Sequence, residues 1–335
     1  MTTSSQDQST KRVVLLTGGA GYVGSVLAKV LASSGFQVIV LDKLFFGNPF
    51  LNTPEISVIK KDVRDISESD LVGVTDVIDL AAISNDSAGD LDKQLTLDIN
   101  FRARERLQKL CVSTGVSRYL LASSSSVYGF QENIVSEESS INPLTIYAEA
   151  NALAEKSAMD LAKSGTVFSA IRQATVYGAS RRMRYDLVVN AIALEAIQGN
   201  PIRLLRDGNQ WRPLVHVLDS SRAMLMILNA PDALVDGEIF NVGGEDQNLT
   251  ILQLAQIICA SLGQDLNIEW YGEIETRSYR VTFEKIRNTL GFVPEITVPE
   301  AVKEIQSGIK DGSLTPKPQN YTVSWYQKLI EDGSL

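Results

Sequence analysis

Residues 13–24 read VVLLTGGAGYVG, and this stretch decides how the chain begins to fold. Residues 13–17 are apolar or β-branched, which predicts a strand buried on both faces. Gly18, Gly21 and Gly24 follow in GxxGxxG spacing, ahead of a segment with the apolar period of a helix. The first glycine permits a tight turn, the second lets the backbone approach a pyrophosphate, and the third lets the helix pack on the strand. Because a helix directs free N–H groups and partial positive charge from its N-terminus, the stretch predicts a phosphate-binding turn.

A second predicted strand, over 37–41, ends at Asp42, 18 residues after Gly24. A dinucleotide site places a carboxylate at this point, where it binds the hydroxyl groups of the adenine ribose. Because Asp42 would repel a 2′-phosphate, the pattern favours NAD over NADP. The alternative is that Asp42 is only a turn residue at the end of a strand.

Length, charge and composition limit the class of protein. The chain has 335 residues, a net charge of −9, two cysteines and a single histidine. The length allows one large domain or two moderate ones, and the negative charge argues against an extended nucleic-acid surface. Two cysteines form no disulfide framework, which fits a reducing, cytoplasmic location, and one histidine excludes a multi-histidine metal site, so we expect no metal. We expect no membrane span, because no apolar run is long enough, and we expect residues 1–10 to form a disordered tail.

Strands and helices alternate over the first half of the chain. Further strands are predicted over 57–61, 76–82, 119–126 and 167–176, and helices over 91–112 and 147–163. This alternation predicts an α/β fold with a doubly wound parallel (Rossmann) sheet in the order 3-2-1-4-5-6. Its ligand is expected at the carboxyl ends of the strands.

The alternation breaks after Gly178. Residues 214–229 and 238–242 are expected to return to the sheet, and helices near 250–262, 283–290 and 299–309 to build a smaller lobe. We therefore expect an NAD-binding domain over 11–178 plus 213–242, and an interleaved substrate-binding lobe over 179–212 plus 243–335.

Several short motifs of the chain are shared with a known enzyme family. They are TGGAGYVG at 17–24, VLDK at 40–43, KDVRD at 61–65, DLAA at 79–82, DIN at 98–100, SSSSVYG at 123–129, Tyr147, IRQATVYG at 171–178 and WRPLVHVLD at 211–219. Together they resemble the extended short-chain dehydrogenase/reductase family, and within it the NAD-dependent epimerase/dehydratase group that acts on nucleotide sugars. The resemblance covers about residues 12–295.

The resemblance implies which residues bind NAD. One group lies in the glycine turn, and others would contact the ribose, the adenine, the pyrophosphate or the nicotinamide side. These residues are Gly18, Gly21, Tyr22, Val23, Gly24, Asp42, Lys43, Asp62, Val63, Leu80, Ala81, Ala82, Asn100 and Tyr147.

It also implies catalytic and substrate-binding residues. Tyr147 matches the acid/base tyrosine, and Ser124 matches the serine that hydrogen-bonds the reacting sugar hydroxyl. Arg212 matches an arginine that grips the substrate's diphosphate, for which a planar guanidinium is suited. Arg280 is either a second such arginine or a surface residue. The implied substrate-binding residues are Ser84, Ser124, Ser125, Ser126, Arg184, Asn190, Arg212 and Arg280.

The chain departs from the family pattern at position 151. The family's tyrosine is followed four residues later by a lysine that bonds the nicotinamide ribose and lowers the tyrosine pKa, whereas this chain has Asn151. An amide can make the ribose bond but carries no charge. One charge ~5 Å away at an effective dielectric of ~20 is worth ~3 kcal/mol, or ~2 pKa units. We therefore expect Tyr147 to keep a pKa near its reference value of ~10, unless oxidised nicotinamide supplies the charge.

An unshifted phenol affects the two directions of the reaction differently. It can give a proton to a ketone, but it takes one slowly from a sugar alcohol at neutral pH. Reduction is therefore less impaired than oxidation, whereas Asp42 disfavours NADPH, the usual donor for reduction. The two observations point in opposite directions.

A second departure concerns Ser125 and Ser126. The family's sugar 4,6-dehydratases carry Asp-Glu at these positions, just before Val-Tyr-Gly. Elimination of water needs a carboxyl acid and base there, so 4,6-dehydration is not expected.

The sequence thus supports an NAD-dependent nucleotide-sugar oxidoreductase or epimerase that transfers hydride at a sugar carbon. Its catalytic residues would be Tyr147, Ser124 and Asn151. Two alternatives stay open: a keto-sugar reductase, and a non-catalytic protein that binds NAD or a nucleotide sugar. The resemblance also implies a homodimer formed through the helices over 91–112 and 147–163.

Overall fold

The strand in the quoted stretch is β1 (Val13–Thr17), and it lies inside the main sheet between β4 and β2. The computed structural model describes residues 12–273 and 277–335, so the tail predicted over 1–10 lies outside the described residues. Both neighbours of β1 run parallel to it, with Leu16 opposite Val40 on one side and Ile78 on the other.

Over the described residues the main sheet has seven parallel strands in the order β11-β7-β5-β4-β1-β2-β3. The predicted order 3-2-1-4-5-6 is confirmed, with a further strand at the β7 edge. Besides β1, the strands are β2 (Gln37–Asp42), β3 (Ile56–Lys60), β4 (Asp76–Asp79), β5 (Arg118–Ser124), β7 (Val167–Gln173) and β11 (Glu238–Val242).

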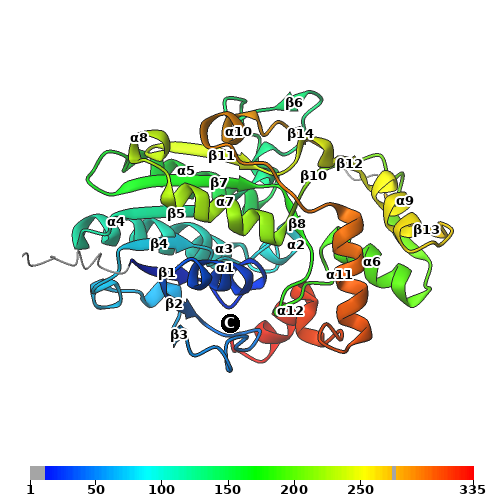
Figure 1. The fold of residues 1–335 in the computed structure, drawn as a ribbon, viewed down its shortest axis with the longest axis horizontal. Coiled ribbons are helices and arrows are strands. Elements are labelled where there is room, and N and C mark those ends of the chain that lie inside the picture. Colours follow the sequence, from blue (N-terminus) through cyan, green and yellow to red (C-terminus); the bar gives the residue numbers. More distant parts are fainter. Residues whose placement is uncertain (1–11, 274–276) are drawn as a thin grey trace, which may run out of the picture.

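Helices cover both faces of this sheet (Figure 1). Val14 and Leu16 face α1 (Tyr22–Ser33) and α7 (Val217–Asn229), whereas Leu15 faces α4 (Arg104–Thr114) and α5 (Ile146–Asp160). Alternate residues of β1 thus reach opposite cores, which explains why the whole strand is apolar.

The helix predicted over 91–112 is interrupted. It comprises α3 (Lys93–Leu97), a π-helical stretch η3 (Asp98–Ala103) and α4. Asn100 lies in the π stretch, is fully buried, and bonds both the N–H and the C=O of Ile83, at 2.8 and 3.0 Å. The extra residue in this turn therefore holds the loop that follows β4, a use that π-bulges often have at functional sites.

The second half of the chain builds another core. Its members are α6 (Val188–Gln198), α9 (Ile251–Ser261) and α11 (Val298–Lys310), which gather on one side in Figure 1. Around them lie β8 (Thr175–Tyr177), β9 (Ile202–Leu205), β10 (Trp211–His216), β12 (Asn248–Thr250) and β13 (Ile268–Tyr271).

Residues 214–216 do not enter the main sheet, contrary to expectation. They belong to β10, which pairs parallel with β8 and antiparallel with β12. Residues 238–242 do return to it, as β11 beside β7. The exact division into two domains stays a prediction.

The remaining elements are short. They are η1 (Val63–Asp65), η2 (Glu68–Leu71), α2 (Asp86–Gly89), η4 (Ser125–Tyr128), β6 (Ile134–Val135), α8 (Asp232–Val235), η5 (Glu245–Gln247), β14 (Arg280–Val281), α10 (Glu284–Leu290) and η6 (Pro318–Asn320).

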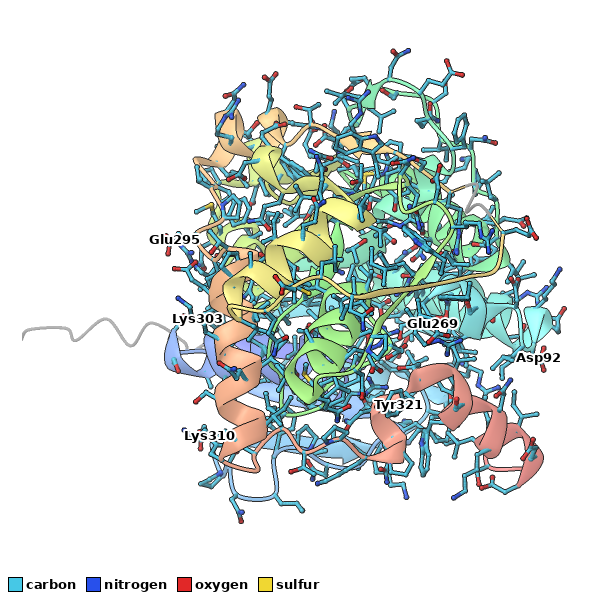
Figure 2. All side chains as sticks on the ribbon, turned by 90° about the vertical axis from the view of Figure 1, so that its right-hand side faces the viewer. Asp92, Glu269, Glu295, Lys303, Lys310 and Tyr321 are labelled. Carbon is cyan, nitrogen blue, oxygen red and sulfur yellow. The ribbon has the colours of Figure 1, made fainter. Side chains whose placement is uncertain are left out.

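The last helix, α12 (Thr322–Glu331), returns to the first half of the chain. Trp325 Nε1 donates a hydrogen bond to the Phe45 carbonyl at 2.7 Å, and the ring of Tyr326 meets Phe46 edge-on. Figure 1 shows α12 near β3, and Figure 2 shows it to the right of the lower half of α11, with Tyr321 just before its first turn. Among the described residues, no helix is long and apolar enough to cross a bilayer.

Candidate active site

A cleft of about 460 Å³ opens at the carboxyl ends of the main strands. Gly18 follows β1, Asp42 ends β2, Leu80 follows β4, Ser124 ends β5 and Gln173 ends β7, and all five line the cleft. The predicted position of the ligand therefore coincides with a real cavity.

Most of the site residues predicted from the sequence line this cleft. They are Gly18, Gly21, Tyr22, Val23, Gly24, Asp42, Lys43, Asp62, Val63, Leu80, Ala81, Ala82, Ser84, Ser124, Ser126, Tyr147, Arg184 and Arg212.

The structure places the other predicted site residues outside the cleft wall. Asn100 supports the loop at Ile83, as described above. Asn190 is buried and accepts a hydrogen bond from the N–H of Gly178 at 3.0 Å, and Arg280 donates to the Glu132 carbonyl at 3.1 Å. These side chains therefore support neighbouring backbone and do not line the cleft.

Two more lie just behind the wall. The Ser125 hydroxyl shares a 3.3 Å hydrogen bond with the hydroxyl of Tyr279, which does line the cleft. Asn151 is 1% exposed, and its Nδ2 donates to the carbonyl of Tyr147 at 2.9 Å. Asn151 therefore lies behind Tyr147, outside the lining of the cleft.

The glycine turn leaves no room for side chains where a phosphate would approach. Gly18 has φ +64°, and a Cβ added there would come within 2.7 Å of the backbone of Ala81. At Gly24 a Cβ would lie 2.5 Å from the Cα of Gly19. Among the described residues, no side chain caps the first N–H groups of α1, so they are available to an anion. The turn therefore fits a dinucleotide pyrophosphate.

Two carboxylates lie at the end of the cleft expected to hold adenine and its ribose. The Asp42 carboxylate accepts hydrogen bonds from the N–H groups of Ala20 at 3.0 Å and Leu44 at 2.7 Å, and burial raises its pKa despite them. Burial also acts to raise the pKa of Asp62, but hydrogen bonds from Arg64 and Lys43 outweigh it and hold that pKa well below the usual range.

Arg182 reaches the same end of the cleft from the second half of the chain. Its guanidinium lies 3.7 Å from the centroid of the Phe46 ring and donates from Nη2 to Thr322 at 3.1 Å. Burial lowers the pKa of Arg182 to about 10. Its Nε and Nη1 are buried and have no hydrogen-bond partner within the described ranges, although the residue lines the cleft.

Tyr147 lies in the first turn of α5, which Thr145 caps through a hydrogen bond to the N–H of Ala148. Its side chain is partly exposed and lines the cleft. Burial and then the carboxylate of Asp86 raise the pKa of Tyr147, while the guanidinium of Arg104 and hydrogen bonds to Ser124 and Asn151 lower it. The net shift is upward, whereas the sequence predicted a pKa near its reference value.

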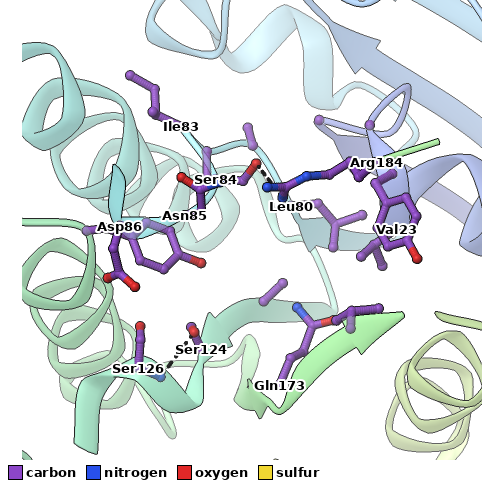
Figure 3. Close-up of a pocket in the computed structure, with 18 of the residues that line it drawn as sticks. Val23, Leu80, Ile83, Ser84, Asn85, Asp86, Ser124, Ser126, Gln173 and Arg184 are labelled. Carbon is purple, nitrogen blue, oxygen red and sulfur yellow. Dashed lines mark hydrogen bonds between the residues drawn. The ribbon is translucent and has the colours of Figure 1, made fainter. Parts of the chain in front are cut away.

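Charged pairs surround the space in front of Tyr147. Asp86 bonds Arg277 at 2.7 Å and accepts from the Thr145 hydroxyl at 2.5 Å. On the opposite wall Arg184 pairs with Asp186 at 2.6 Å and donates to the hydroxyl of Ser84 at 3.2 Å. Figure 3 shows Asp86, Ser124 and Ser126 on one side of the cavity and Ser84 with Arg184 across it. The cavity thus offers hydroxyls and guanidinium groups to a polyhydroxylated anion.

Sequence reasoning missed six charged residues that line the cleft, namely Lys61, Asp86, Arg104, Arg182, Asp186 and Arg277. Arg104 is predicted to be a helix residue, but no spacing shows that its side chain turns into the protein. The others lie on loops or in α2, where no residue spacing marks them.

A family model described as the NAD dependent epimerase/dehydratase family matches residues 14–243. The chain belongs to this family. As a member of the epimerase/dehydratase family it is an NAD-dependent enzyme, which confirms the cofactor predicted from Asp42 and the glycine turn.

Relatives within and around the epimerase/dehydratase family carry different reactions in their names. The chain is 28% identical over 312 residues to a putative UDP-glucose 4-epimerase of Methanocaldococcus jannaschii, across 90% of this chain and 100% of the relative. It is 26% identical to a dTDP-glucose 4,6-dehydratase of Streptomyces niveus, across 91% and 95%. The solved structure of MoeE5 in complex with UDP-glucuronic acid and NAD has a TM-score of 0.80 at 26% identity, across 89% of this chain and 99% of that one.

Proposed function

We propose that this protein is a nucleotide-sugar epimerase that moves a hydride at one sugar carbon with NAD. The observation that carries the proposal is the placement of Tyr147 and Ser124 in the same cleft as the glycine turn of Gly18. A dinucleotide held by the turn and a sugar beside the phenol would share one cavity.

The chain's own residues have separate tasks in this reaction. The N–H groups at the start of α1 would hold the pyrophosphate, and Asp42 would bind the ribose hydroxyls. NAD, when bound, accepts and returns the hydride. Tyr147 takes the proton of the reacting hydroxyl and later returns it, while Ser124 orients the oxygen.

A nucleotide diphosphate fits the guanidinium groups of the cleft. Arg184 and Arg212 both line the cleft, and a guanidinium is suited to phosphate oxygens. The ligands of the related MoeE5 structures, UDP-glucuronic acid and UDP-glucose, support the same substrate class.

We infer that the reaction is not a 4,6-dehydration. The hydroxyls of Ser125 and Ser126 stand where an acid and a base would be needed, and neither can serve as a carboxyl group. Because a dTDP-glucose 4,6-dehydratase is among the relatives, the assay has to score loss of water as well as epimerisation.

The test is a screen of UDP-, GDP-, CDP- and dTDP-sugars between pH 7 and 10, with products separated by chromatography. The expected result is epimerisation of one nucleotide sugar, with none by Tyr147→Phe. Protein that binds NAD yet turns over no sugar at any pH, or that releases a 4-keto-6-deoxy product, would contradict the proposal.

A keto-sugar reductase is the second candidate, favoured by the raised pKa of Tyr147. A phenol that stays protonated at neutral pH can donate a proton to a ketone. Stopped-flow oxidation of bound NADH by 4-keto nucleotide sugars distinguishes this candidate, and absence of NADH oxidation would exclude it.

A further inference from the structure

Arg104 is a buried cation behind the catalytic wall. It is the first residue of α4, and only 1% of it is exposed. Nε donates to the carbonyl of Ala81 at 3.2 Å and Nη2 to that of Ala122 at 3.4 Å, so the guanidinium spans the ends of β4 and β5. Two backbone carbonyls thus fix a positive charge at the edge of the cleft.

The third contact of Arg104 leads to the tyrosine. Nη1 donates to Oδ1 of Asn151 at 2.9 Å, and Nδ2 of the same amide donates to the Tyr147 carbonyl at 2.9 Å. Asn151 thus accepts from the arginine and donates to the helix, and it also hydrogen-bonds the side chain of Tyr147. The residue at the lysine position therefore supplies no charge itself but holds a charged side chain.

We propose that Arg104, oriented by Asn151, supplies the positive charge that the family's lysine would bring to Tyr147. Arg104 is then a positioning residue, and the two positions form a compensated pair. This inference rests on the proposed function, since it assigns a task within the same proton transfer.

Asp79 is the buried carboxylate that pairs with Arg104, through Nε at 3.9 Å, while Nη1 of the same guanidinium bonds Asn151. The two oxygens of Asp79 also accept hydrogen bonds from the hydroxyls of Thr17 and Tyr119, each at 2.6 Å. The negative charge of Asp79 is thus stabilised by neutral donors as well as by Arg104.

The remaining charged groups around Tyr147 are paired elsewhere. Asp86 faces the phenol from α2 and is bonded by Arg277, and Arg184 faces it from the opposite wall and is bonded by Asp186. Further along α5, Glu155 pairs with Arg172 of β7 at 2.9 Å. Arg104 also acts to lower the pKa of Tyr147 against the effects of burial and Asp86.

The kinetic test removes the positive charge at position 104 and then restores a positive charge at position 151. Arg104→Gln should slow sugar oxidation about tenfold between pH 7 and 9, and should shift the rising limb of the pH profile upward by about one unit. Arg104→Gln combined with Asn151→Lys should recover much of the rate and should bring the limb of the pH profile back to its original pH. The reason is that a cation is again near the phenol. An unchanged profile in Arg104→Gln, or a double variant no faster than the single one, would overturn the proposal.

Two control variants separate charge from folding. Arg104→Lys keeps the charge and should keep more of the rate than Arg104→Gln. Arg172→Gln removes another buried arginine next to α5 and should lower the melting temperature without moving the pH profile. A profile that moves equally in Arg172→Gln would mean that lost stability, not lost charge, explains the effect.

A readout without substrate keeps this inference distinct from the proposed function. In protein labelled with ¹³Cζ-tyrosine, the Tyr147 resonance is assigned by its loss in Tyr147→Phe. It should begin to titrate at higher pH in Arg104→Gln than in the unaltered protein, even if no nucleotide sugar is turned over. Identical titrations in the two proteins would refute the role of Arg104 whatever the enzyme's substrate.

Discussion

The hydroxyl of Tyr147 sets the pH dependence of the proposed reaction. Because its pKa lies above the ordinary value, the phenol is protonated through neutral pH, and the phenolate fraction rises about tenfold per pH unit below that pKa. We expect the single-turnover rate of sugar oxidation to rise steadily from pH 7 to 9, while reduction of a keto sugar stays nearly constant. Stopped-flow absorbance of NADH in both directions measures this, and a flat oxidation rate would contradict it.

Gly18 and Gly35 allow a matched test of the phosphate turn. Both have positive φ, but a Cβ at Gly18 meets the Ala81 backbone at 2.7 Å, whereas one at Gly35 meets nothing within 4 Å. Gly35→Ala should cost about 1 kcal/mol of stability and leave NAD binding intact. Gly18→Ala should cost more and weaken NAD binding at least about tenfold, measured by calorimetry. Equal NAD affinity in the two variants would contradict the close approach at Gly18.

Asp62 should make stability depend on acidity. Its pKa is depressed in the folded protein, so its contribution is full above the unfolded value of about 4 and is lost as the pH falls below it. Asp62→Asn should cost about 1 kcal/mol at neutral pH, since its partners Arg64 and Lys43 are partly exposed. The difference from the unaltered protein should shrink in urea titrations as the pH approaches about 2. A difference that persists undiminished would show that the Asp62 charge is not its source.

At the scale of elements, α12 should stabilise the adenine end of the cleft. Trp325→Phe removes the hydrogen bond to the Phe45 carbonyl, which should cost about 1 kcal/mol in urea denaturation and loosen NAD binding a few-fold. Trp270→Phe is the control, because Trp270 is 40% exposed and lies on β13, away from the cleft. If both substitutions have the same effect on NAD affinity, α12 does not contribute to the coenzyme site.

How well each element could be predicted depends on how local its cause is. The β1–turn–α1 unit and Asp42 follow from residues close in sequence, and the structure matches them. The break of the 91–112 helix at Asn100 depends on the Ile83 loop, and the docking of Trp325 depends on Phe45, 280 residues earlier. Such contacts exist only after the chain has packed, so periodicity and capping signals do not show them.

The same holds for the site. Tyr147, Ser124 and the glycine turn follow from motifs, since Ser124 and the glycines mark the ends of particular strands and Tyr147 matches the family's tyrosine. Arg104 could be predicted only as a helix residue, since its direction into the protein depends on the carbonyls of Ala81 and Ala122. Side chains on loops that would face the substrate follow no helical or strand periodicity, so the sequence does not identify them.

For the whole molecule we predict a homodimer formed through α4 and α5. Their outer surfaces carry ion pairs between Glu105 and Lys109 and between Lys156 and Asp160, and the chain's resemblance to its family implies pairing here. Light scattering at micromolar concentration should give twice the mass of one chain. A monomer under these conditions would refute this prediction.

Helix α1 belongs to both cores of the molecule. Leu27 and Leu31 pack on the main sheet, whereas Tyr22 packs among residues of the second core and bonds the Gly178 carbonyl at 2.6 Å. A hinge motion between the two halves would have to break the contacts of this helix with one of the two cores. We therefore expect that only side chains and short loops at the rim of the cleft move when substrate enters. Small-angle scattering curves should then superimpose with and without coenzyme.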